Sequence, residues 1–548
     1  MLIEKGHART AKAYILYRDK RTRIREAKSE LMDVVKDILL EDSREHEIDN
    51  GNSPTHKLHQ IAISVSQTYY LDSLIPEELA NAHKAGLLHI HDLGYYSKTV
   101  DSFLLGVSEK MYLESGRIVH PMSVSGELFS FLFNLAGTIK KGNNDIFGEL
   151  SLPEFDRSVG RIMRGFTRKP DRGDIHGALN GFISYLRGLP SSDEDQAMKC
   201  SMQVGLDTSE EGREVARAIL QGLRSPNLQG QCWPRLLFLI KQDVNFSDHA
   251  PNKDILKIAL KAAVQNNTIS LVFLDNVTEN NDTSLSPVFF SSGLRILENQ
   301  HGRHGGLGRG NIATVTLNLP RLAMVTKDKA LFFVELDRLL RMCIRQLLHR
   351  YEVLAVLKRR DLPFLMGEKM FLGSEGLNVS DPIQAALKNG VLTVNFTGMP
   401  ETTRALLGEK ARDNDEVLNL VKEIARHMRR RIDLFAQEFE LNIGLSGAIS
   451  STHLRHFTEN DRKDFGLIRG VTDRELYSPS FFLFQEDNSL HHTIEIESVL
   501  QKTCSTGYSS RLFLLPGSDH GGVEALLSQL KEAGFGHITI HTLSRGMI

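Results

Sequence analysis

The sequence lacks the closely spaced cysteines of a zinc-binding or disulfide-rich protein. Its four cysteines, Cys200, Cys232, Cys343 and Cys504, are scattered over 548 residues. Neither a Cys-x-x-Cys zinc motif nor a disulfide framework is therefore present. We interpret all four as buried or idle thiols, and Cys343 falls on the apolar stripe of an expected helix.

The chain also lacks a long apolar run and an excess of one charge. No window reaches the ~18 continuous apolar residues of a membrane helix, and the N-terminus is charged from Glu4 onward, unlike a signal peptide. We therefore expect a cytoplasmic protein. Lys and Arg number 66 against 68 Asp and Glu, a net charge of −2. This balance offers no broad attraction to nucleic acid or to a membrane surface.

What is present is the composition of a folded globular protein, 41% hydrophobic and 24% charged. Short apolar runs separated by helical stretches predict an α/β fold. The clearest helices are expected over 329–359 and 417–439. The expected buried strands are 235–240, 269–273, 312–317, 391–396 and 538–541.

Two polar segments are candidate ligand sites. His89-Ile90-His91-Asp92 can hold a polar ligand, hold a metal, or only hydrogen-bond a turn. The glycine-rich stretch 302–311 can bring backbone amides close to a phosphate, or it can be a flexible loop. Because it precedes a strand and does not join a strand to a helix, it is neither a dinucleotide fingerprint nor a Walker motif.

Several short motifs follow one another along almost the whole chain. They are Lys5-Gly6, Thr10–Tyr14 (TAKAY), His89–Leu93 (HIHDL), Gly308–Ile312 (GRGNI), Thr316–Leu322 (TLNLPRL), Phe396–Glu401 (FTGMPE), Asp461–Gly466 (DRKDFG) and Lys531–Gly534 (KEAG). Together they resemble the catalytic subunit of anaerobic, class III ribonucleotide reductases. The resemblance implies an α/β barrel of two half-sheets surrounded by helices, as in ribonucleotide reductases and glycyl-radical enzymes. It also implies a homodimer.

The resemblance further implies a domain organisation. Residues 1–48 are expected to form an N-terminal helical segment resembling the end of an ATP-cone linker, and residues 49–548 a single reductase-like barrel domain with a helical layer. Family members continue into a four-cysteine zinc site and a radical-bearing glycine, whereas this sequence stops at Ile548. The radical domain, its zinc and its glycyl radical are therefore expected to be absent, and no other cofactor is expected.

Enzymes of this family are similar in using a cysteine on a loop inside the barrel to take hydrogen from the ribose. Serine O–H and leucine C–H bonds are much stronger than a thiol S–H bond, so only sulfur serves well in this step. Matching Gly293 and Arg295 to the residues that flank the family cysteine places Leu294 at the radical position, within one or two residues. Ser102 is the expected counterpart of the second active-site cysteine. No catalytic residue is therefore expected in this chain.

The same resemblance suggests which residues line a substrate cavity. Asn311 matches a family asparagine that can hydrogen-bond a ligand, although a role at the start of a strand accounts for it equally well. The expected cavity residues are His91, Asp92, Asn311, Gly398, Met399, Pro400 and Glu401.

We therefore interpret the chain as a radical-deficient, nucleotide-binding pseudoenzyme related to anaerobic ribonucleoside-triphosphate reductase. A nucleoside triphosphate is the ligand that the resemblance suggests. One alternative is an active reductase whose glycyl-radical domain is a separately supplied chain. Another is a scaffold or regulator that pairs with an active reductase subunit.

Overall fold

The computed structural model describes residues 54–108, 124–166, 168–188, 198–223, 233–266, 268–277, 288–412, 414–447, 452–484, 490–515 and 520–542, with residue 111 and isolated residues of 32–39. The chain forms two compact units. One comprises Met1–Ala80, Asp92–Tyr96 and Ser191–Ala197, and the other comprises Asn81–His91, Ser97–Pro190 and Met198–Ile548. The predictions for the Lys5–Tyr14 motifs, for Cys232 and for the chain's last residues lie outside the described residues.

The smaller unit contains helix α2 (Pro54–Tyr69), the π-helical turn η2 (Tyr70–Leu74) and the short 3-10 helix η3 (Leu93–Tyr95). The hydroxyl of Tyr95 lies 2.7 Å from Nε2 of His59 in α2, and the rings of Tyr70 and Tyr96 are 5.9 Å apart. Aromatic side chains therefore hold η3 against α2 and η2.

The larger unit contains the sheet and most of the helices. Its strands are β1 (Leu88–Ile90), β2 (Ser102–Leu104), β3 (Leu150–Leu152), β4 (Cys200–Val204), β5 (Arg235–Ile240), β6 (Ile269–Phe273), β7 (Gly310–Asn318), β8 (Val391–Thr397), β9 (Ile443–Ser446), β10 (Leu483–Phe484), β11 (Ser509–Leu514) and β12 (His537–Thr542). Its main helices are α5 (Val124–Gly142), α6 (Phe155–Arg164), α7 (Arg172–Gly188), α8 (Glu210–Gly222), α9 (Lys253–Gln265), α10 (Leu319–Thr326), α11 (Lys329–Ala355), α12 (Gln384–Leu387), α13 (Met399–Leu407), α14 (Asn414–Phe439), α15 (Thr452–Phe465), α16 (Leu490–Thr503) and α17 (His520–Ala533). Helix α3 (Glu77–Lys84) leads to β1.

The strands form a closed barrel of two half-sheets. Strands β2 to β6 are successive parallel neighbours, and β7 to β9 are parallel to one another, as are β11 and β12. The halves join where β2 pairs with β7 and β12 with β6, both antiparallel. A parallel bridge between Gly447 and Tyr508 connects the end of β9 to β11 and closes the ring. The predicted fold class, an α/β barrel of two half-sheets surrounded by helices, is confirmed.

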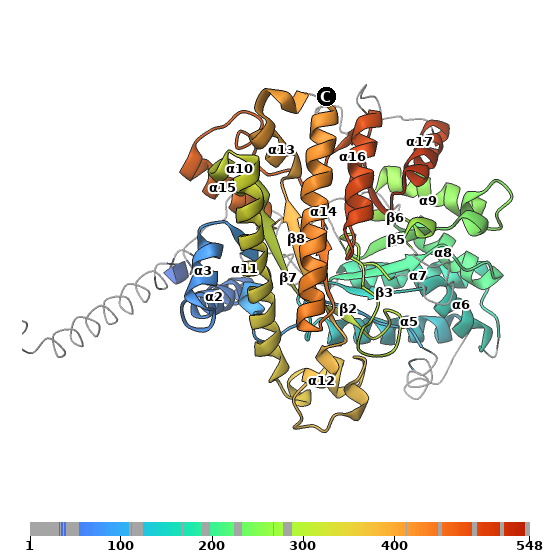
Figure 1. Cartoon of the computed structure of the whole chain (residues 1–548). Helices are drawn as coiled ribbons and strands as arrows, with labels where there is room; N and C mark the ends of the chain where they lie inside the picture. Colours follow the sequence, from blue (N-terminus) through green and yellow to red (C-terminus); the bar gives the residue numbers. More distant parts are fainter. Residues whose placement is uncertain are drawn as a thin grey trace, which may run out of the picture. The chain divides into compact units, whose positions relative to one another are not determined.

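Helices cover the outside of the barrel because the crossovers between parallel strands place them there. Figure 1 shows the long helices α11 and α14 side by side over β7 and β8. Figure 1 also shows α5, α7 and α8 beside the strands of the first half-sheet. The fully buried stripe of α11 includes Leu336, Leu340 and Leu347. Among the described residues, no helix is both long and apolar enough to cross a bilayer.

A loop formed by residues 288–296 lies inside the barrel. Phe289 bridges Arg295 in antiparallel fashion, so the loop is a narrow hairpin with its tip at 291–294. The carbonyl of Phe289 accepts bonds from Ser151 of β3 and Gln203 of β4, at 3.1 and 2.7 Å. On the opposite side, Arg295 N–H donates to the carbonyl of Thr506, near the start of β11, at 2.9 Å. Contacts to both half-sheets therefore fix the loop within the ring of strands.

Glycine is required where this loop meets the wall. Gly293 has φ +92°, and a Cβ there would lie 2.7 Å from Cβ of Ser509 in β11. Gly507 has φ +95°, and a Cβ there would lie 2.1 Å from the carbonyl oxygen of Gly293. Only two glycines allow the two backbones to approach so closely.

Candidate functional site

The inner face of β7 and β8 is lined by hydroxyl and amide side chains. Successive side chains of a strand alternate between the two faces of a sheet, and the side chains that contact the loop 288–296 identify the inner face. Leu104 of β2 packs against Leu294 of the loop, so the inner face of β2 also includes Ser102. The polar residues on the matching face of β7 and β8 are Asn311, Thr314, Thr316, Asn318, Thr393, Asn395 and Thr397, all buried except the half-buried Thr314. A register irregularity between Asn311 and Ala313 brings Asn311 to the same face as Thr314.

Asn311 is the centre of a hydrogen-bonded network on this face. Its amide nitrogen donates to Oδ2 of Asp101 and to the hydroxyl of Thr314, the latter at 2.8 Å. Its amide oxygen accepts the hydroxyl of Thr393 at 2.8 Å. Ser102 lies directly opposite Asn311 across the β2–β7 junction and donates to Asp101 at 3.1 Å. The structure thus brings Ser102 and Asn311 together, and adds Asp101, which the sequence did not single out.

His91 lies beside this network. Its Nε2 is 2.7 Å from the hydroxyl of Thr316, which also accepts from the amide of Asn395 at 3.1 Å. The backbone carbonyl of His91 accepts from the buried guanidinium of Arg350 at 2.9 Å. Burial, and then the charge of Arg350, lower the pKa of His91 from 6.5 to about 3. The ring is therefore neutral at neutral pH. One of its nitrogens donates a hydrogen bond and the other accepts one, and the tautomer decides which.

The tip of the loop 288–296 presents no sulfur. Leu294 is buried and packs against Leu104, Val288 and Phe290, with Ile296 beside them. Ser291 is anchored by Glu149, whose carboxylate accepts from its backbone N–H and its hydroxyl. Burial raises the pKa of Glu149, although its hydrogen bonds to Ser201 and Ser291 oppose that rise.

Cationic and imidazole groups lie on the wall formed by β5, β11 and β12. Ser509 of β11 hydrogen-bonds Nδ1 of His537 in β12 at 2.8 Å. Burial, and then the charge of Arg235 in β5, lower the pKa of His537 to about 3. Burial, and then the charge of Arg511 in β11, lower the pKa of His541 to about 4. Arg235 and Arg511 therefore supply the positive charge and the neutral histidines supply hydrogen-bonding nitrogens, a combination that can bind an anionic ligand.

The turn 398–401 lies where β8 ends and α13 begins. Gly398 has φ +74°, and a Cβ there would lie 2.2 Å from Pro320, so glycine is required. Met399 is buried and Pro400 is half-buried in the first turn of the helix. The carboxylate of Glu401 accepts from the hydroxyl and N–H of Ser478, at 2.7 and 3.1 Å, and burial raises its pKa.

The other residues singled out from the sequence are Asp92 and the cysteines. Asp92 belongs to the smaller unit, where it has φ 54° and its carbonyl accepts from Tyr95 N–H. Cys200, Cys343 and Cys504 are buried, and burial raises the pKa of each thiol. Cys200 alternates with Ser201 on β4, so it faces the helices and not the barrel interior.

The glycine-rich stretch 302–311 wraps around a buried arginine. Arg309 is fully buried and donates to the carbonyls of Asn389, Leu297 and Gly305, at 2.7, 2.8 and 2.9 Å. Burial lowers its pKa to about 10. Backbone carbonyls therefore accept hydrogen bonds from this buried cation, and the stretch leads into β7.

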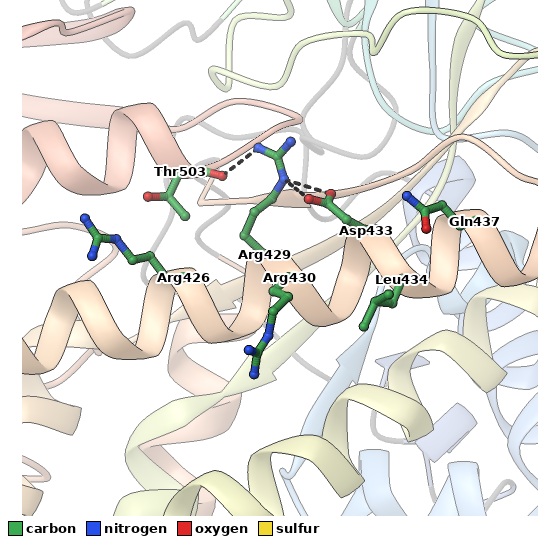
Figure 2. Close-up of a pocket in the computed structure, with 7 residues that line it drawn as sticks. All are labelled: Arg426, Arg429, Arg430, Asp433, Leu434, Gln437 and Thr503. Atoms are coloured by element: carbon green, nitrogen blue, oxygen red, sulfur yellow. Dashed lines mark hydrogen bonds and ion pairs between the residues drawn. The ribbon is translucent and has the colours of Figure 1, made fainter.

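A cavity lies on the surface of α14, outside the barrel. Figure 2 shows it lined by Arg426, Arg429 and Arg430 with Leu434 and Gln437, and by Thr503 at the end of α16. Its volume is about 300 Å³. Arg429 donates to both oxygens of Asp433 at 2.8 Å and to the carbonyl of Thr503 at 3.1 Å. One of its three arginines is thus already paired, and the other two are exposed on the helix surface.

Comparison with known proteins identifies relatives of the whole barrel. A family model described as anaerobic ribonucleoside-triphosphate reductase matches residues 45–544. The anaerobic ribonucleoside-triphosphate reductase of Escherichia coli (strain K12) is 26% identical over 521 residues, covering 88% of this chain and 72% of the relative.

Solved structures agree on the fold. The anaerobic ribonucleotide reductase from Thermotoga maritima with glycerol in the active site matches with a TM-score of 0.68 at 14% identity, covering 93% of this chain and 85% of that chain. The structure of the same enzyme in complex with dATP and CTP gives a TM-score of 0.65 at 14% identity, covering 94% of this chain and 90% of that chain. The resemblance read from the sequence motifs is confirmed.

Proposed function

Because the chain belongs to the family of anaerobic ribonucleoside-triphosphate reductases, we propose that it is a nucleotide-binding homologue that does not by itself reduce nucleotides. A fold does not fix a function, so the proposal must be argued from the site. The observation that carries it is the loop 288–296, which projects into the barrel with Ser291, Ser292, Gly293 and Leu294 at its tip and no thiol.

The chemistry of that tip decides the reaction class. Hydrogen abstraction from a sugar carbon has two conditions. The bond that the radical forms with hydrogen must be comparable in strength to the sugar C–H bond that breaks, and the radical itself must form reversibly on the protein side chain. A thiol meets both conditions, whereas the hydrocarbon side chain of Leu294 and the hydroxyl of Ser102 do not. The sequence contains no cysteine between Cys232 and Cys343, so a shift in the alignment of the loop supplies none.

The polar interior supports retention of a nucleotide. Asn395 and Thr397 of β8 are buried, and Oδ1 of Asn395 and Oγ1 of Thr397 have no hydrogen-bond partner among the described residues. Buried polar atoms without partners are costly, and a bound ligand or water is an ordinary way to satisfy them. The related Thermotoga maritima enzyme has been solved with dATP and CTP, and we propose the same class of ligand here.

Among the residues suggested by the sequence, we keep His91 and Asn311 as ligand contacts on the inner face. Asn311 already bonds Asp101, Thr314 and Thr393, so its role would be to hold the wall in place as well as to face the ligand. The turn 398–401 directly follows the C-terminal end of β8, where Thr397 lies. Within this turn, the carboxylate of Glu401 accepts a hydrogen bond from Ser478.

The test is thermal unfolding of the full chain with and without each ribonucleoside and deoxyribonucleoside triphosphate. A ligand at ~100 times its dissociation constant stabilises the native state by ~2.7 kcal/mol. The absence of a shift with every nucleotide would refute binding. Deoxynucleotide formation with an activase and a reductant, but no added glycyl-radical chain, would refute the claim that the chain is inactive alone.

Two further outcomes separate the alternatives. Deoxynucleotide formation only when a separate glycyl-radical chain is added would identify this chain as the barrel of a split reductase. Stable co-purification with a full-length reductase, without any effect of nucleotides on the unfolding temperature, would identify a scaffold or regulator.

A further inference from the structure

Three histidines from separate elements of the larger unit come together beside β1. His83 lies in the last turn of α3, His89 in β1 and His456 in α15. One ligand nitrogen of each lies within 4.8 Å of those of the other two. We propose that this histidine triad binds a transition-metal ion of the Zn²⁺ class, at a site that adjoins His91 of the inner-face network but does not depend on nucleotide binding.

The three rings lie close together. The centroid of His83 lies 5.1 Å from that of His89 and 5.4 Å from that of His456, and His89 and His456 are 5.9 Å apart. A fourth ring, His91, meets His89 edge-on at 4.8 Å, but its Nε2 is engaged by Thr316. The triad therefore offers three nitrogens and leaves a fourth position for a water molecule or another small ligand.

This donor set selects a class of ion. Imidazole nitrogen suits Zn²⁺, Co²⁺, Ni²⁺ and Cu²⁺, whereas Mg²⁺ and Ca²⁺ require oxygen ligands. Three protein nitrogens with one open position is a recurrent arrangement for tetrahedral Zn²⁺. The triad contains no carboxylate, so the hard cations have nothing to bind.

The triad lies partly open to solvent. Metal binding requires the neutral form of each imidazole. His83 is buried, whereas His89 and His456 are half-buried, which gives an ion a path from solvent.

Outer contacts orient two of the rings. Nε2 of His456 lies 3.4 Å from the carbonyl oxygen of His83 and 3.2 Å from the amide nitrogen of Asn460. The tautomer with the proton on Nε2, which donates to that carbonyl, is the one that leaves the Nδ1 lone pair for a metal. Metal-binding histidines commonly donate their second nitrogen to such a carbonyl. Nδ1 of His83 accepts Ile90 N–H at 3.3 Å. Coordination through Nε2 of His83 places the ring proton on Nδ1, so this hydrogen bond must break when the ion binds.

An ion at the triad would link α3 and β1 to α15. Helix α15 also carries Asp461, which accepts from Asn318 at 2.9 Å, from Tyr477 at 2.7 Å and from Arg321 at 2.6 Å. The metal would thus fix the helix that supports the end of β7 and the start of α10. We expect it to raise the unfolding temperature of the full chain.

The test is metal binding by the full chain after treatment with a chelator. We expect about one equivalent of Zn²⁺ to bind in competition with a chromophoric chelator, and Co²⁺ to give visible d–d absorption bands. We expect Mg²⁺ at the same concentration to leave the unfolding temperature unchanged. His89→Gln and His456→Gln should each weaken Zn²⁺ binding by more than the ~10–100-fold that loss of an outer-shell partner causes.

The chain offers a matched control on its surface. His491 and His492 form an exposed group with Glu495 at the start of α16, which is the place where an adventitious ion would bind. The double variant His491→Asn, His492→Asn should still bind one equivalent of Zn²⁺ tightly and should still give the Co²⁺ absorption bands. The proposal is overturned if the double variant no longer binds Zn²⁺ tightly, or if His456→Gln and His89→Gln bind Zn²⁺ as tightly as the wild type. It is also overturned if the wild-type chain binds no ion.

Discussion

The carboxylate of Glu149 holds the backbone of Ser291, with both of its oxygens 3.0 Å from the Ser291 amide nitrogen. The same carboxylate accepts the hydroxyls of Ser291 and of Ser201 in β4. Glu149 directly precedes β3, so a single acidic side chain ties the tip of the loop 288–296 to the barrel wall. Glu149 therefore adds a buried anchor at the loop tip to the contacts that Ser151, Gln203 and Thr506 make with the rest of the loop.

Replacement of Glu149 by alanine should destabilise the fold. The substitution leaves the N–H and hydroxyl of Ser291 and the hydroxyl of Ser201 without an acceptor, and a buried donor without a partner costs ~1–3 kcal/mol. We expect a loss of roughly 3 kcal/mol in urea-induced unfolding, since the freed groups relax in part. Glu423→Ala is the control, because the Glu423–Lys329 ion pair is exposed and such pairs contribute ~0–1 kcal/mol. Equal losses in both variants would contradict the anchoring role.

Asn395 provides a test of nucleotide binding inside the barrel. Its amide donates to Thr316 at 3.1 Å, while its oxygen has no partner among the described residues. Asn395→Ala should therefore reduce the nucleotide-induced thermal shift, with an affinity loss of about tenfold if one hydrogen bond is lost. Asn276→Ala is the control, because that amide only joins the carbonyls of Lys531 and Phe535. An unchanged affinity in Asn395→Ala would remove Asn395 from the binding site.

Glu497 should make stability fall as pH rises. Burial raises the pKa of this carboxyl from 4.5 to about 7, although bonds from Ser510, Tyr508 and Phe481 oppose the rise. The native state then binds the proton more tightly than the unfolded state, so the contribution is complete below pH 4.5 and is lost as pH rises through about 7.

Glu497→Gln keeps the shape of the side chain and cannot ionise. We expect its free energy of unfolding, measured in urea from pH 4.5 to 8, to depend less on pH than that of the wild type. The difference over this window is at most ~3 kcal/mol. Asp156, whose pKa burial raises to about 7, keeps part of the slope in the variant. If the free energy of unfolding changed with pH equally in the variant and the wild type, Glu497 would not titrate in this range.

The regular elements with strong local patterns could be predicted from the sequence. The expected strands 235–240 and 269–273 coincide with β5 and β6, and the expected helix 329–359 contains α11. Their patterns are long runs of buried apolar residues or a clear helical stripe. Short strands such as β2 and β9 were missed, because three or four residues carry too little periodicity.

The candidate site was predictable only where a motif marked it. Asn311 and His91 were found through the family resemblance, but Asp101 and Glu149 were not, because their partners are distant in sequence. Glu149 meets Ser291 across 142 residues, and Asn311 meets Asp101 across 210. The histidine triad was missed for the same reason, since His83 and His456 lie in helices 373 residues apart. Only the closure of the barrel brings these groups together.

Leu294→Cys tests directly whether the loop tip is enclosed by the barrel. Leu294 is 6% exposed and packs on Leu104, Val288 and Phe290, so a thiol there should react slowly with an aromatic disulfide reagent in the native chain. Val356→Cys is the control, because Val356 is 73% exposed and a thiol at that position should react at the rate of a free cysteine.

In urea, the introduced thiol of both variants should react quickly with the reagent. This control shows that slow reaction in the native chain comes from shielding by the fold and not from an unreactive thiol. Replacement of a buried leucine by the smaller cysteine should cost about 2 kcal/mol, within the range for large-to-small core substitutions, so the chain remains folded during the measurement. If the Leu294→Cys thiol reacted as fast as the Val356→Cys thiol, the loop tip would lie in solvent. The proposal that this position is the enclosed, sulfur-free counterpart of a radical site would then have no structural basis.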